Sequence, residues 1–323
     1  MRHFLSLSEF TPAEINGLLD LATRLKKEWK RGGNKPILKG QSLALFFEKP
    51  SLRTRVSFEM AMHHLGGYAF YLNNSEIGLG VRESAPDVAR VLSRYVQGIM
   101  ARVFKHSNLE IMAQYASVPI INGLSDYDHP CQVMADLLTL REHIGDFGGK
   151  QFVFIGDGYN MANGLLFGAS KIGLNITIAT PEAYKPVKEV MAKAMEFAEE
   201  SGAMVKWTTD PGEAFRHADV VYTDVWTSMG QEAENEIRRK AFRDYQLNAQ
   251  LMKHAPARAL IMHCLPAHRG EEITDEVADA PNSIVFDQAE NRLHAQKAIV
   301  AWLMGGVALP GEKKATRTKR TPK

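Results

Sequence analysis

Short apolar runs alternate with longer segments that have one apolar side along almost the whole chain. Residues 43–47 and 151–155 have the length and composition of buried strands. Residues 130–144 carry apolar side chains at helical spacing and begin with a proline, which suits the first position of a helix. Alternation of this kind is typical of a parallel sheet flanked by helices. The sequence therefore predicts an α/β protein.

The alternation runs twice, with a glycine-rich break at residues 145–150. We therefore predict two doubly wound parallel-sheet domains, 1–145 and 146–289. In such sheets ligands bind outside the carboxyl ends of the strands, so the active site is expected in the crevice between the two domains. A last strand is expected at 283–286. A C-terminal helix is expected at 290–305 and should pack back onto the first domain.

The composition argues against several classes of protein. The 323 residues carry a formal net charge of +2, so no large basic face for a nucleic acid is expected. No apolar run approaches the ~18 residues of a membrane span. Two cysteines, Cys131 and Cys264, make no disulfide framework and indicate a reducing, cytoplasmic setting. Residues 311–323 are rich in Lys, Arg and Thr without apolar periodicity, and they are predicted to be a disordered basic tail.

An anion site is predicted where the strand at 43–47 gives way to a helix. Ser51 stands at this boundary, and serine is a favoured N-cap. Free N–H groups and the positive end of the helix dipole attract anions at such a position. Arg53, Thr54 and Arg55 follow directly and supply the guanidinium and hydroxyl groups that bind phosphate. A capped surface helix with solvated arginines is the alternative interpretation.

Further polar side chains lie near predicted strand ends and helix starts. Arg102 ends a strand, whereas His129 and Gln132 begin the helix at 130–144. His129 is able to donate to a developing oxyanion, and Gln132 offers both a donor and an acceptor. Arg292 is expected at the start of the last helix, facing an anion. Structural roles remain open for His129, and a surface salt bridge remains open for Arg292.

The second half of the chain supplies groups suited to an amine. Asp224 ends a strand and is able to hold a cationic amine, and the segment 228–230 is a candidate lid. A simple turn with a helix cap is the alternative. Cys264 is either a reactive thiolate or a buried thiol. His263, Cys264 and His268 do not have the spacing of a closed zinc site, so no metal is expected.

A glycine-bearing turn at 156–158 resembles half of a dinucleotide fingerprint. The full fingerprint requires glycine at the position of Met161. A nicotinamide-dependent dehydrogenase is therefore a weaker alternative. Asn160 is interpreted instead as a side chain that reaches into the crevice.

Four motifs occur together in one order. They are Ser51-Leu52-Arg53-Thr54-Arg55, His129-Pro130-Cys131-Gln132, Asp224 with Ser228-Met229-Gly230, and His263-Cys264-Leu265-Pro266. With these motifs the chain resembles the ornithine carbamoyltransferases of the aspartate/ornithine carbamoyltransferase family from about residue 3 to 305. The resemblance implies transfer of a carbamoyl group from carbamoyl phosphate to the δ-amine of L-ornithine, either in arginine biosynthesis or, in the reverse direction, in arginine breakdown. It also implies no cofactor, no metal, and a homotrimer or a multiple of trimers.

The resemblance also implies roles for individual residues. The implied catalytic residues are Arg53, Arg102, His129, Gln132, Asp224 and Cys264. The implied carbamoyl phosphate-binding residues are Ser51, Leu52 (through its backbone N–H), Arg53, Thr54, Arg102, His129, Pro130, Cys131, Gln132, Cys264, Leu265 and Arg292. The implied ornithine-binding residues are Asn160, Asp224, Ser228 and Met229.

The chain departs from the family pattern in three places. Leu52 stands where threonine is common, and Tyr159 replaces a frequent asparagine. Gly78 aligns with a glutamine that many relatives donate from the loop at 73–82 to a neighbouring subunit. The segment 228–230 favours ornithine over putrescine, which has no carboxylate to hold, and over acetylornithine. A family member that has lost activity and only binds a phosphorylated metabolite is the remaining alternative.

Overall fold

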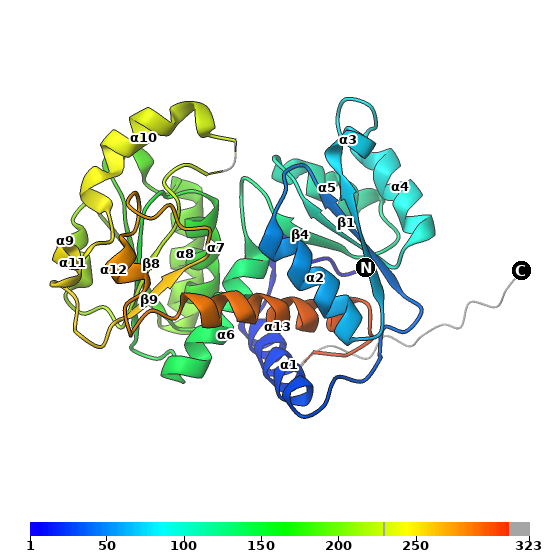
Figure 1. Cartoon of the computed structure of the whole chain (residues 1–323), viewed down its shortest axis with the longest axis horizontal. Coiled ribbons are helices and arrows are strands. Elements are labelled where there is room, and N and C mark those ends of the chain that lie inside the picture. Colours follow the sequence, from blue (N-terminus) through cyan, green and yellow to red (C-terminus); the bar gives the residue numbers. More distant parts are fainter. Residues whose placement is uncertain (229, 310–323) are drawn as a thin grey trace, which may run out of the picture.

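Each half of the chain forms one parallel sheet with helices against its faces (Figure 1). The computed structural model describes residues 1–228 and 230–309. The α/β fold with two parallel sheets is as the sequence predicts. The predicted tail at 311–323 lies outside the described residues.

The first sheet has the strand order β2-β1-β3-β4. Its strands are β1 (Ser42–Phe47), β2 (Tyr68–Asn73), β3 (Gly98–Arg102) and β4 (Ile120–Leu124). The accompanying helices are α1 (Pro12–Lys30), α2 (Leu52–His64), α3 (Asn74–Ile77), α4 (Ala85–Tyr95), α5 (His106–Tyr115) and α6 (Pro130–Ile144).

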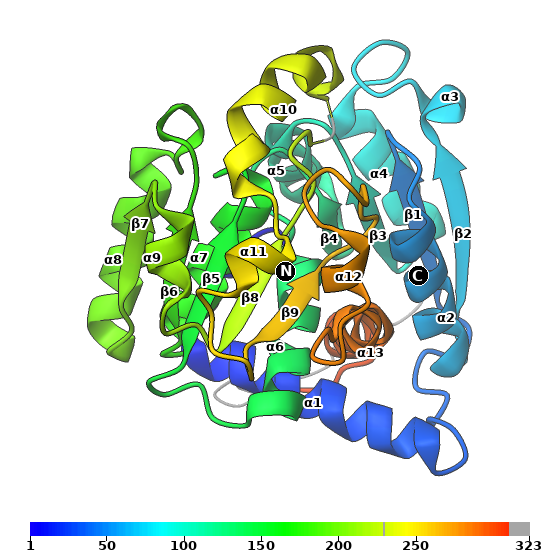
Figure 2. The same cartoon turned by 60° about the vertical axis from the view of Figure 1, so that its left-hand side comes forward.

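The second sheet has the order β7-β6-β5-β8-β9, and Figure 2 shows its strands side by side. Its strands are β5 (Gln151–Ile155), β6 (Asn175–Ala179), β7 (Val205–Thr208), β8 (Val220–Thr223) and β9 (Leu260–His263). The remaining helices are α7 (Asn160–Lys171), α8 (Lys188–Ser201), α9 (Pro211–Phe215), α10 (Asn235–Phe242), α11 (Ala249–Met252), α12 (Asp275–Ala278) and α13 (Val285–Leu303). Short 3-10 turns cover Leu7–Glu9, Glu182–Tyr184, Glu232–Glu234 and Arg243–Tyr245.

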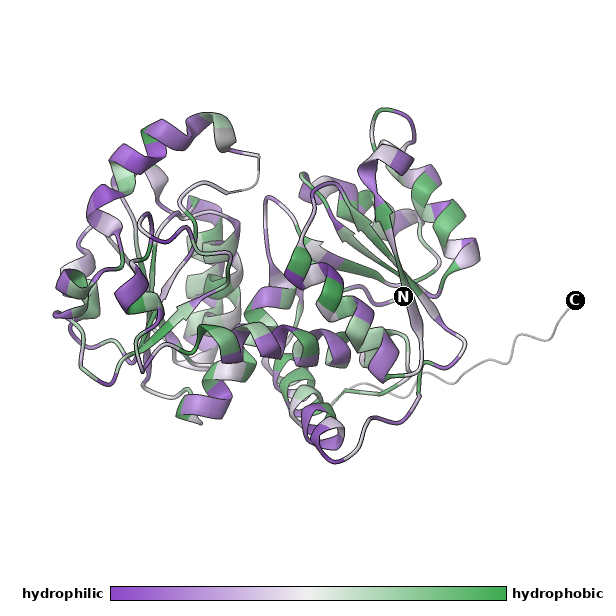
Figure 3. Ribbon diagram, viewed as in Figure 1, coloured by the Kyte–Doolittle hydropathy of each residue, from purple (hydrophilic) through white to green (hydrophobic). Residues whose placement is uncertain are grey.

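The central strands of both sheets are buried by the helices that cover them, whereas the edge strands β2 and β7 are partly exposed. The five residues 43–47 of β1 are at most 1% exposed, which explains their unbroken apolar sequence. Figure 3 shows the hydrophobic colour gathered on the strands and the inner sides of the helices. Helix α13 packs against α1, α2 and α6 of the first lobe and also contacts β9 of the second (Figure 1). It therefore ties the two lobes together.

Each sheet has a point where the strand order reverses. In the first sheet β1 lies between β2 and β3, and in the second sheet β5 lies between β6 and β8. The loops after the strands on either side of such a point leave in opposite directions and open a crevice. The fold therefore positions the segments that follow β1, β3, β5 and β8 to build a site.

Local signals in the sequence placed several helices correctly. Helix α6 covers the predicted residues 130–144, and α1 begins with a capping box formed by Thr11 and Glu14. The strand predicted at 283–286 is wrong, because helix α13 begins at Val285 and only Ser283 makes a bridge, to Ile261. The helix expected at 290–305 thus starts five residues earlier.

Two further differences concern loops. Helix α10 was not predicted from its largely polar sequence. The segment at 73–82 contains the short helix α3, whose Ile77 is buried. No helix among the described residues combines the length and the apolar character that a membrane-spanning segment needs.

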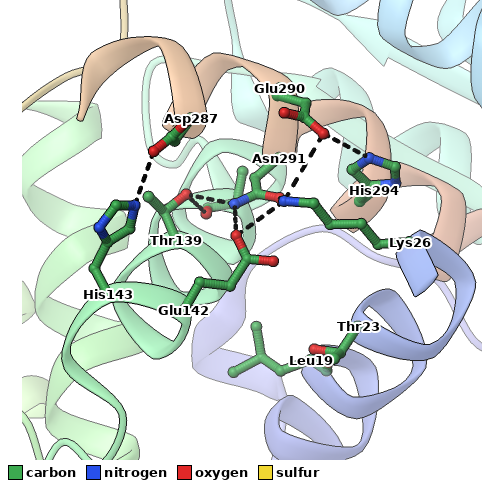
Figure 4. Close-up of polar contacts among 11 residues, drawn as sticks. Leu19, Thr23, Lys26, Thr139, Glu142, His143, Asp287, Glu290, Asn291 and His294 are labelled. Atoms are coloured by element: carbon green, nitrogen blue, oxygen red, sulfur yellow. Dashed lines mark hydrogen bonds and ion pairs between the residues drawn. The ribbon is translucent and has the colours of Figure 1, made fainter. Parts of the chain in front are cut away.

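A polar network connects α1, α6 and α13 beneath the sheets (Figure 4). The Lys26 Nζ donates to Glu142 Oε2 at 2.9 Å and to Asn291 Oδ1 at 2.8 Å. The Asn291 amide nitrogen donates to Thr139 Oγ1 at 3.0 Å and to Glu142 Oε2 at 2.8 Å. Buried polar groups stabilise a fold when they are mutually satisfied, so this network fixes the relative positions of the three helices.

We predict that His294 on α13 makes the fold sensitive to acid. Burial lowers its pKa to about 3, assisted by the positive charges of Lys297 and Lys26. The unfolded chain binds this proton near the ordinary histidine pKa of ~6.5, so stability is full above that pH and falls as the pH drops toward 3. Because glutamine does not titrate, the unfolding free energy of His294→Gln should fall less on acidification than that of the wild type, by up to ~1.4 kcal/mol for each pH unit.

Urea unfolding of the wild type and His294→Gln at about pH 7 and about pH 5, at fixed protein concentration, measures the effect. The control is His143→Gln, because His143 is partly exposed and pairs with exposed Asp287 at 2.9 Å. If the stability difference between wild type and His294→Gln were equal at both pH values, the assignment would be wrong.

Candidate active site

A cavity of about 110 Å³ lies between the two lobes. Its lining comes from the first turns of α2, α6 and α7, the ends of β3 and β4, the segments after β8 and β9, and helix α13. Of the predicted site residues it contains Ser51, Arg53, Thr54, Arg102, His129, Gln132, Asn160, Asp224, Ser228, Cys264, Leu265 and Arg292. Residues that are far apart in sequence and come from both halves of the chain thus meet in one cavity.

The first turn of helix α2 forms one wall. Ser51 is the N-cap, as predicted, and its hydroxyl accepts from the Thr54 N–H at 3.4 Å. Thr54 is fully buried, and its Oγ1 accepts from Arg292 Nη2 at 3.1 Å. Leu52 points outward, with 72% of its surface exposed, and does not line the cavity. Only its backbone is therefore in a position to serve an anion.

Three guanidinium groups face this turn. Burial lowers the pKa of Arg102 to about 10, with added repulsion from Arg292 and Arg53. Burial also lowers the pKa of Arg292 and of Arg53, and repulsion from Arg53 adds to the effect on Arg292. The Arg102 Nε has no hydrogen-bond partner among the described residues. A bound anion would offset the repulsion between the guanidiniums and would supply the missing acceptor. The cluster is therefore suited to bind an anion.

The start of helix α6 supplies neutral polar groups. Burial, with repulsion from Arg292 and Arg102, lowers the pKa of His129 well below its ordinary value. Its imidazole is therefore neutral at physiological pH, with one N–H to donate. The Gln132 Oε1 accepts from Arg292 Nη1 at 2.7 Å. His129 and Gln132 are thus placed beside the arginines, where a carbonyl oxygen bearing negative charge would be stabilised.

Two residues of the same motif do not reach the cavity. Pro130 is the first residue of α6, and Cys131 is fully buried beneath it. The Cys131 thiol donates to the Asn122 carbonyl oxygen at 3.2 Å, and burial raises its pKa to about 12. Cys131 is therefore an unreactive core residue, and a direct side-chain contact of Cys131 or Pro130 with a ligand is not supported.

The opposite wall carries a carboxylate and a thiol. The Cys264 Sγ donates to Asp224 Oδ1 at 2.9 Å, and the Val225 N–H donates to the same oxygen at 2.8 Å. Burial and the negative charge of Asp224 raise the pKa of Cys264 well above its ordinary value. Cys264 is thus a neutral hydrogen-bond donor, and of the two alternatives left open by the sequence the reactive thiolate is disfavoured.

The segment after β9 brings Leu265 and Pro266 to the cavity. Leu265 lines it with a φ of 56° and precedes a cis peptide bond to Pro266. The Leu265 N–H donates to His263 Nδ1 at 2.8 Å, and His263 Nε2 bonds Glu272 at 3.0 Å. The potential metal-ligand atoms of Asp224, His263 and Cys264 all lie within 4.8 Å of one another, close enough to share an ion. Both ring nitrogens of His263 are already engaged, which leaves it no lone pair for a metal ion.

The turn at 156–158 has a structural explanation. A Cβ at Gly158 would lie 2.4 Å from the Pro186 nitrogen and 2.5 Å from the Tyr184 oxygen, so only glycine fits there. In a dinucleotide site this close approach would be made by the pyrophosphate of the cofactor, but at Gly158 it is made by the backbone of residues 184–186. Asn160 begins α7, lines the cavity and donates to the Ser125 carbonyl oxygen of the first lobe at 2.8 Å.

The rest of the predicted site is accounted for as follows. Ser228 lines the cavity, whereas Met229 lies outside the described residues. Gly78 ends α3 with a φ of 63° and does not line the cavity. Sequence analysis missed four lining residues, Leu124, Met161, Val225 and Pro266. Apart from the position of Pro266 beside Leu265, these residues carry no polar signal that would have identified them.

Comparisons with known proteins agree along nearly the whole chain. Residues 2–142 match the carbamoyl-P binding domain of aspartate/ornithine carbamoyltransferase, and residues 148–303 match its Asp/Orn binding domain. The ornithine carbamoyltransferase of Pyrococcus abyssi is 54% identical over 306 residues, covering 95% of this chain and 96% of that protein. The anabolic ornithine carbamoyltransferase of Pyrococcus furiosus is 53% identical, covering 95% and 97%.

A solved structure is similar over the same span. The ornithine carbamoyltransferase from Pyrococcus furiosus superposes with a TM-score of 0.92 at 52% identity, covering 95% of this chain and 98% of that chain.

We predict that Arg53→Ala weakens the binding of inorganic phosphate by about 10–100-fold, because a hydrogen bond to a charged group contributes ~1.5–3 kcal/mol. Isothermal titration calorimetry measures the affinity. Arg55→Ala is the matched control, since Arg55 lies on the same helix but pairs with Glu59 at 2.9 Å outside the cavity. The control should keep the wild-type affinity. Equal phosphate affinity in Arg53→Ala and wild type would remove Arg53 from the site.

Proposed function

The chain belongs to the aspartate/ornithine carbamoyltransferase family, and on this premise we propose that its interdomain cavity is an ornithine carbamoyltransferase site. The reaction transfers the carbamoyl group of carbamoyl phosphate to the δ-amine of L-ornithine and yields L-citrulline and phosphate. One observation carries the proposal most directly: three guanidiniums at a helix N-terminus face Asp224 and Cys264 across a single cavity. The cavity thereby places a binding site for an oxyanion group next to a binding site for an amine.

The phosphate of carbamoyl phosphate is assigned to the first turn of α2. Backbone N–H groups from Leu52 onward and the hydroxyls of Ser51 and Thr54 surround this position. Arg53 and Arg102 neutralise the phosphate charge. Burial removes part of the water around these two cations, and the phosphate dianion replaces the lost water contacts with ion pairs.

The carbonyl of the carbamoyl group is assigned to the groups around helix α6. His129, which is neutral, and Arg102 are the donors to its oxygen, and Arg292 holds Gln132 beside them. These donors strengthen as negative charge develops on the oxygen, so they stabilise the transition state more than the substrate. One donor of this kind is typically worth ~2.7–4 kcal/mol.

The amino-acid substrate is assigned to the second lobe. Asp224 receives the α-ammonium group, and Asn160, Ser228 and Met229 complete the site for the α-amino and α-carboxylate groups. The side chain of ornithine then extends toward Cys264 and the Leu265 carbonyl oxygen. This direction leads the δ-amine to the carbamoyl carbon.

The bonding changes follow from the two substrates. The lone pair of the neutral δ-amine attacks the carbamoyl carbon, a C–N bond forms, and a tetrahedral intermediate carries the charge on oxygen. The C–O bond to phosphate then breaks, and the amine proton leaves with the products. Nucleophile and leaving group are both present in the substrates, so the protein contributes positioning and charge stabilisation without a metal or an organic cofactor.

The setting of the enzyme is part of the proposal. We assign carbamoyl phosphate to the domain 1–145, supplemented by α13, and ornithine to the domain 146–289. The Pyrococcus furiosus relative is described as anabolic, which supports a role in arginine biosynthesis. Both cysteines are free, which suits the cytoplasm.

A homotrimer, or a multiple of trimers, is also proposed. Val56 and Met60 on α2 and Tyr68 on β2 leave 45%, 38% and 65% of their surfaces exposed. Helix α2 and strand β2 pack against each other, so one subunit contact would cover all three side chains.

The pure protein should form citrulline from carbamoyl phosphate and L-ornithine. Under the same conditions aspartate, putrescine and N-acetylornithine should give at most ~1% of that rate, because a missing or altered ion pair costs ~3 kcal/mol or more. A colorimetric assay for the ureido product measures all four amines. The absence of citrulline from ornithine would end this assignment.

Replacing Cys264 separates its role from that of a nucleophile. We predict that Cys264→Ala raises the KM for ornithine and lowers kcat by about tenfold each, because the hydrogen bond to charged Asp224 contributes ~1.5–3 kcal/mol. Cys264→Ser retains a donor and should recover most of both losses. Steady-state kinetics with ornithine varied provide the test. Unchanged ornithine kinetics in the alanine variant would show that Cys264 has been misassigned.

A further inference from the structure

A fully buried carboxylate lies beneath the cavity without lining it. Asp136 is in the middle of α6 and is 0% exposed. Its Oδ1 accepts from Gln132 Nε2 at 2.8 Å and from Gln288 Nε2 at 2.7 Å. Its Oδ2 accepts from the Tyr222 hydroxyl at 3.2 Å. The donors come from α6, α13 and β8, so this one side chain connects both lobes.

The chemistry of a carboxylate decides which way the two glutamine amides point. An ionised carboxylate only accepts, so each amide must turn its NH₂ toward Asp136 and its oxygen away. The Gln132 oxygen then accepts from Arg292 Nη1 at 2.7 Å. The Gln288 oxygen accepts from the His263 N–H at 3.0 Å, at the last residue of β9. Through the two glutamines, Asp136 thereby orients Arg292 on one side and the His263 backbone, which directly precedes Cys264, on the other.

Tyr222 provides a second connection to the same thiol. Its hydroxyl donates its one proton to Asp136 Oδ2 and also lies beside the Cys264 thiol. The Cys264 Sγ donates its own proton to Asp224 Oδ1 at 2.9 Å. Hydrogen bonds therefore connect Arg292, Gln132, Asp136 and Tyr222, and Tyr222 packs against the thiol that holds Asp224.

We propose that Asp136 is a positioning residue for carbamoyl transfer, because its carboxylate sets Gln132 with Arg292 on the anion side and Gln288 with the His263 backbone, next to Cys264, on the amine side in one mutual geometry. The inference rests on the proposed function. It assigns a task to a group that touches neither substrate. A displacement of either half by a fraction of an ångström is enough to slow a reaction between bound groups.

Electrostatics supports this role. Burial raises the pKa of Asp136 to about 7, although Gln132, Gln288, Arg292 and Tyr222 all favour its ionised form. A buried carboxylate is unfavourable for folding unless its partners compensate. The ionised acid accepts all three bonds, two amides on Oδ1 and the Tyr222 hydroxyl on Oδ2. A proton on Oδ2 would reverse the bond to Tyr222 and leave the two amides on a neutral, weaker acceptor.

Asp136→Asn tests the orientation directly. Asparagine has one acceptor oxygen and no charge. Either its NH₂ faces the Tyr222 hydroxyl and the bonds from both glutamines lose their charge assistance, or its NH₂ faces the two amide donors and Gln132 or Gln288 turns over. Turning either amide breaks its bond to Arg292 or to the His263 N–H. We expect kcat to fall by about 10–100-fold, as for other residues that orient ligand-contacting groups, with the KM values for carbamoyl phosphate and ornithine both raised.

Tyr222→Phe separates the two sides. It removes the bond to Asp136 Oδ2 and the hydroxyl beside Cys264, but leaves both glutamine bonds to Asp136 Oδ1 in place. The KM for ornithine should rise by about fivefold or more, and the affinity for carbamoyl phosphate should stay within about twofold. General destabilisation would not produce this split. In the double variant the effects on kcat/KM should be less than additive, because both changes interrupt one series of contacts.

Thr139→Val is the matched control. Thr139 lies one turn further along α6, is equally buried, donates to the Ala135 carbonyl oxygen at 2.7 Å and accepts from Asn291 at 3.0 Å (Figure 4). Replacing its hydroxyl removes two buried hydrogen bonds, to Ala135 and Asn291, and neither of these residues lines the cavity. Thr139→Val should lower Tm but keep the wild-type kcat and both KM values.

Steady-state kinetics and thermal unfolding of the four variants and the wild type decide the matter. Wild-type kinetics in Asp136→Asn, or an equal loss of activity in Thr139→Val, would overturn the positioning role. If the wild type formed no citrulline in the same assay, the proposed function would fail instead, so the two failures are distinguishable.

Discussion

The gathering of three partly or fully buried guanidiniums around one cavity is the constraint on which the rest of the structure depends. Loss of hydration lowers the pKa of Arg53, Arg102 and Arg292, and repulsion adds to this effect at Arg102 and Arg292. An incoming dianion offsets the lost hydration and the repulsion. Affinity for phosphate and stabilisation of a developing oxyanion thus follow from the same cluster of cations.

The scaffold explains how such a cluster is held in place. Each arginine comes from a different element: the first turn of α2, the end of β3 and the middle of α13. Two parallel sheets present their strand-order reversals to the same cavity, and α13 contacts both lobes. The polar network around Lys26 and Asn291 fixes α13 against α1 and α6. Rigidity below the cavity therefore supports the geometry within it.

The sequence predicted what local chemistry determines. Ser51 was predicted as a cap because capping acts within three residues, and most of the polar lining was predicted from motifs at strand ends. Asp136 was not predicted, since its partner Gln288 lies 152 residues away and nothing in the local pattern indicates the contact. The predicted strand at 283–286 failed for a related reason, because packing of α13 against α6 overrides the local preference of β-branched residues.

The most direct test is a crystal structure with an analogue in which a phosphonoacetyl group is joined to the δ-nitrogen of ornithine. The phosphonate should contact the N–H groups at the start of α2 between Arg53 and Arg102, and the α-ammonium group should contact Asp224. A phosphonate bound outside this cavity, or Arg53 and Arg102 directed away from it, would contradict the account.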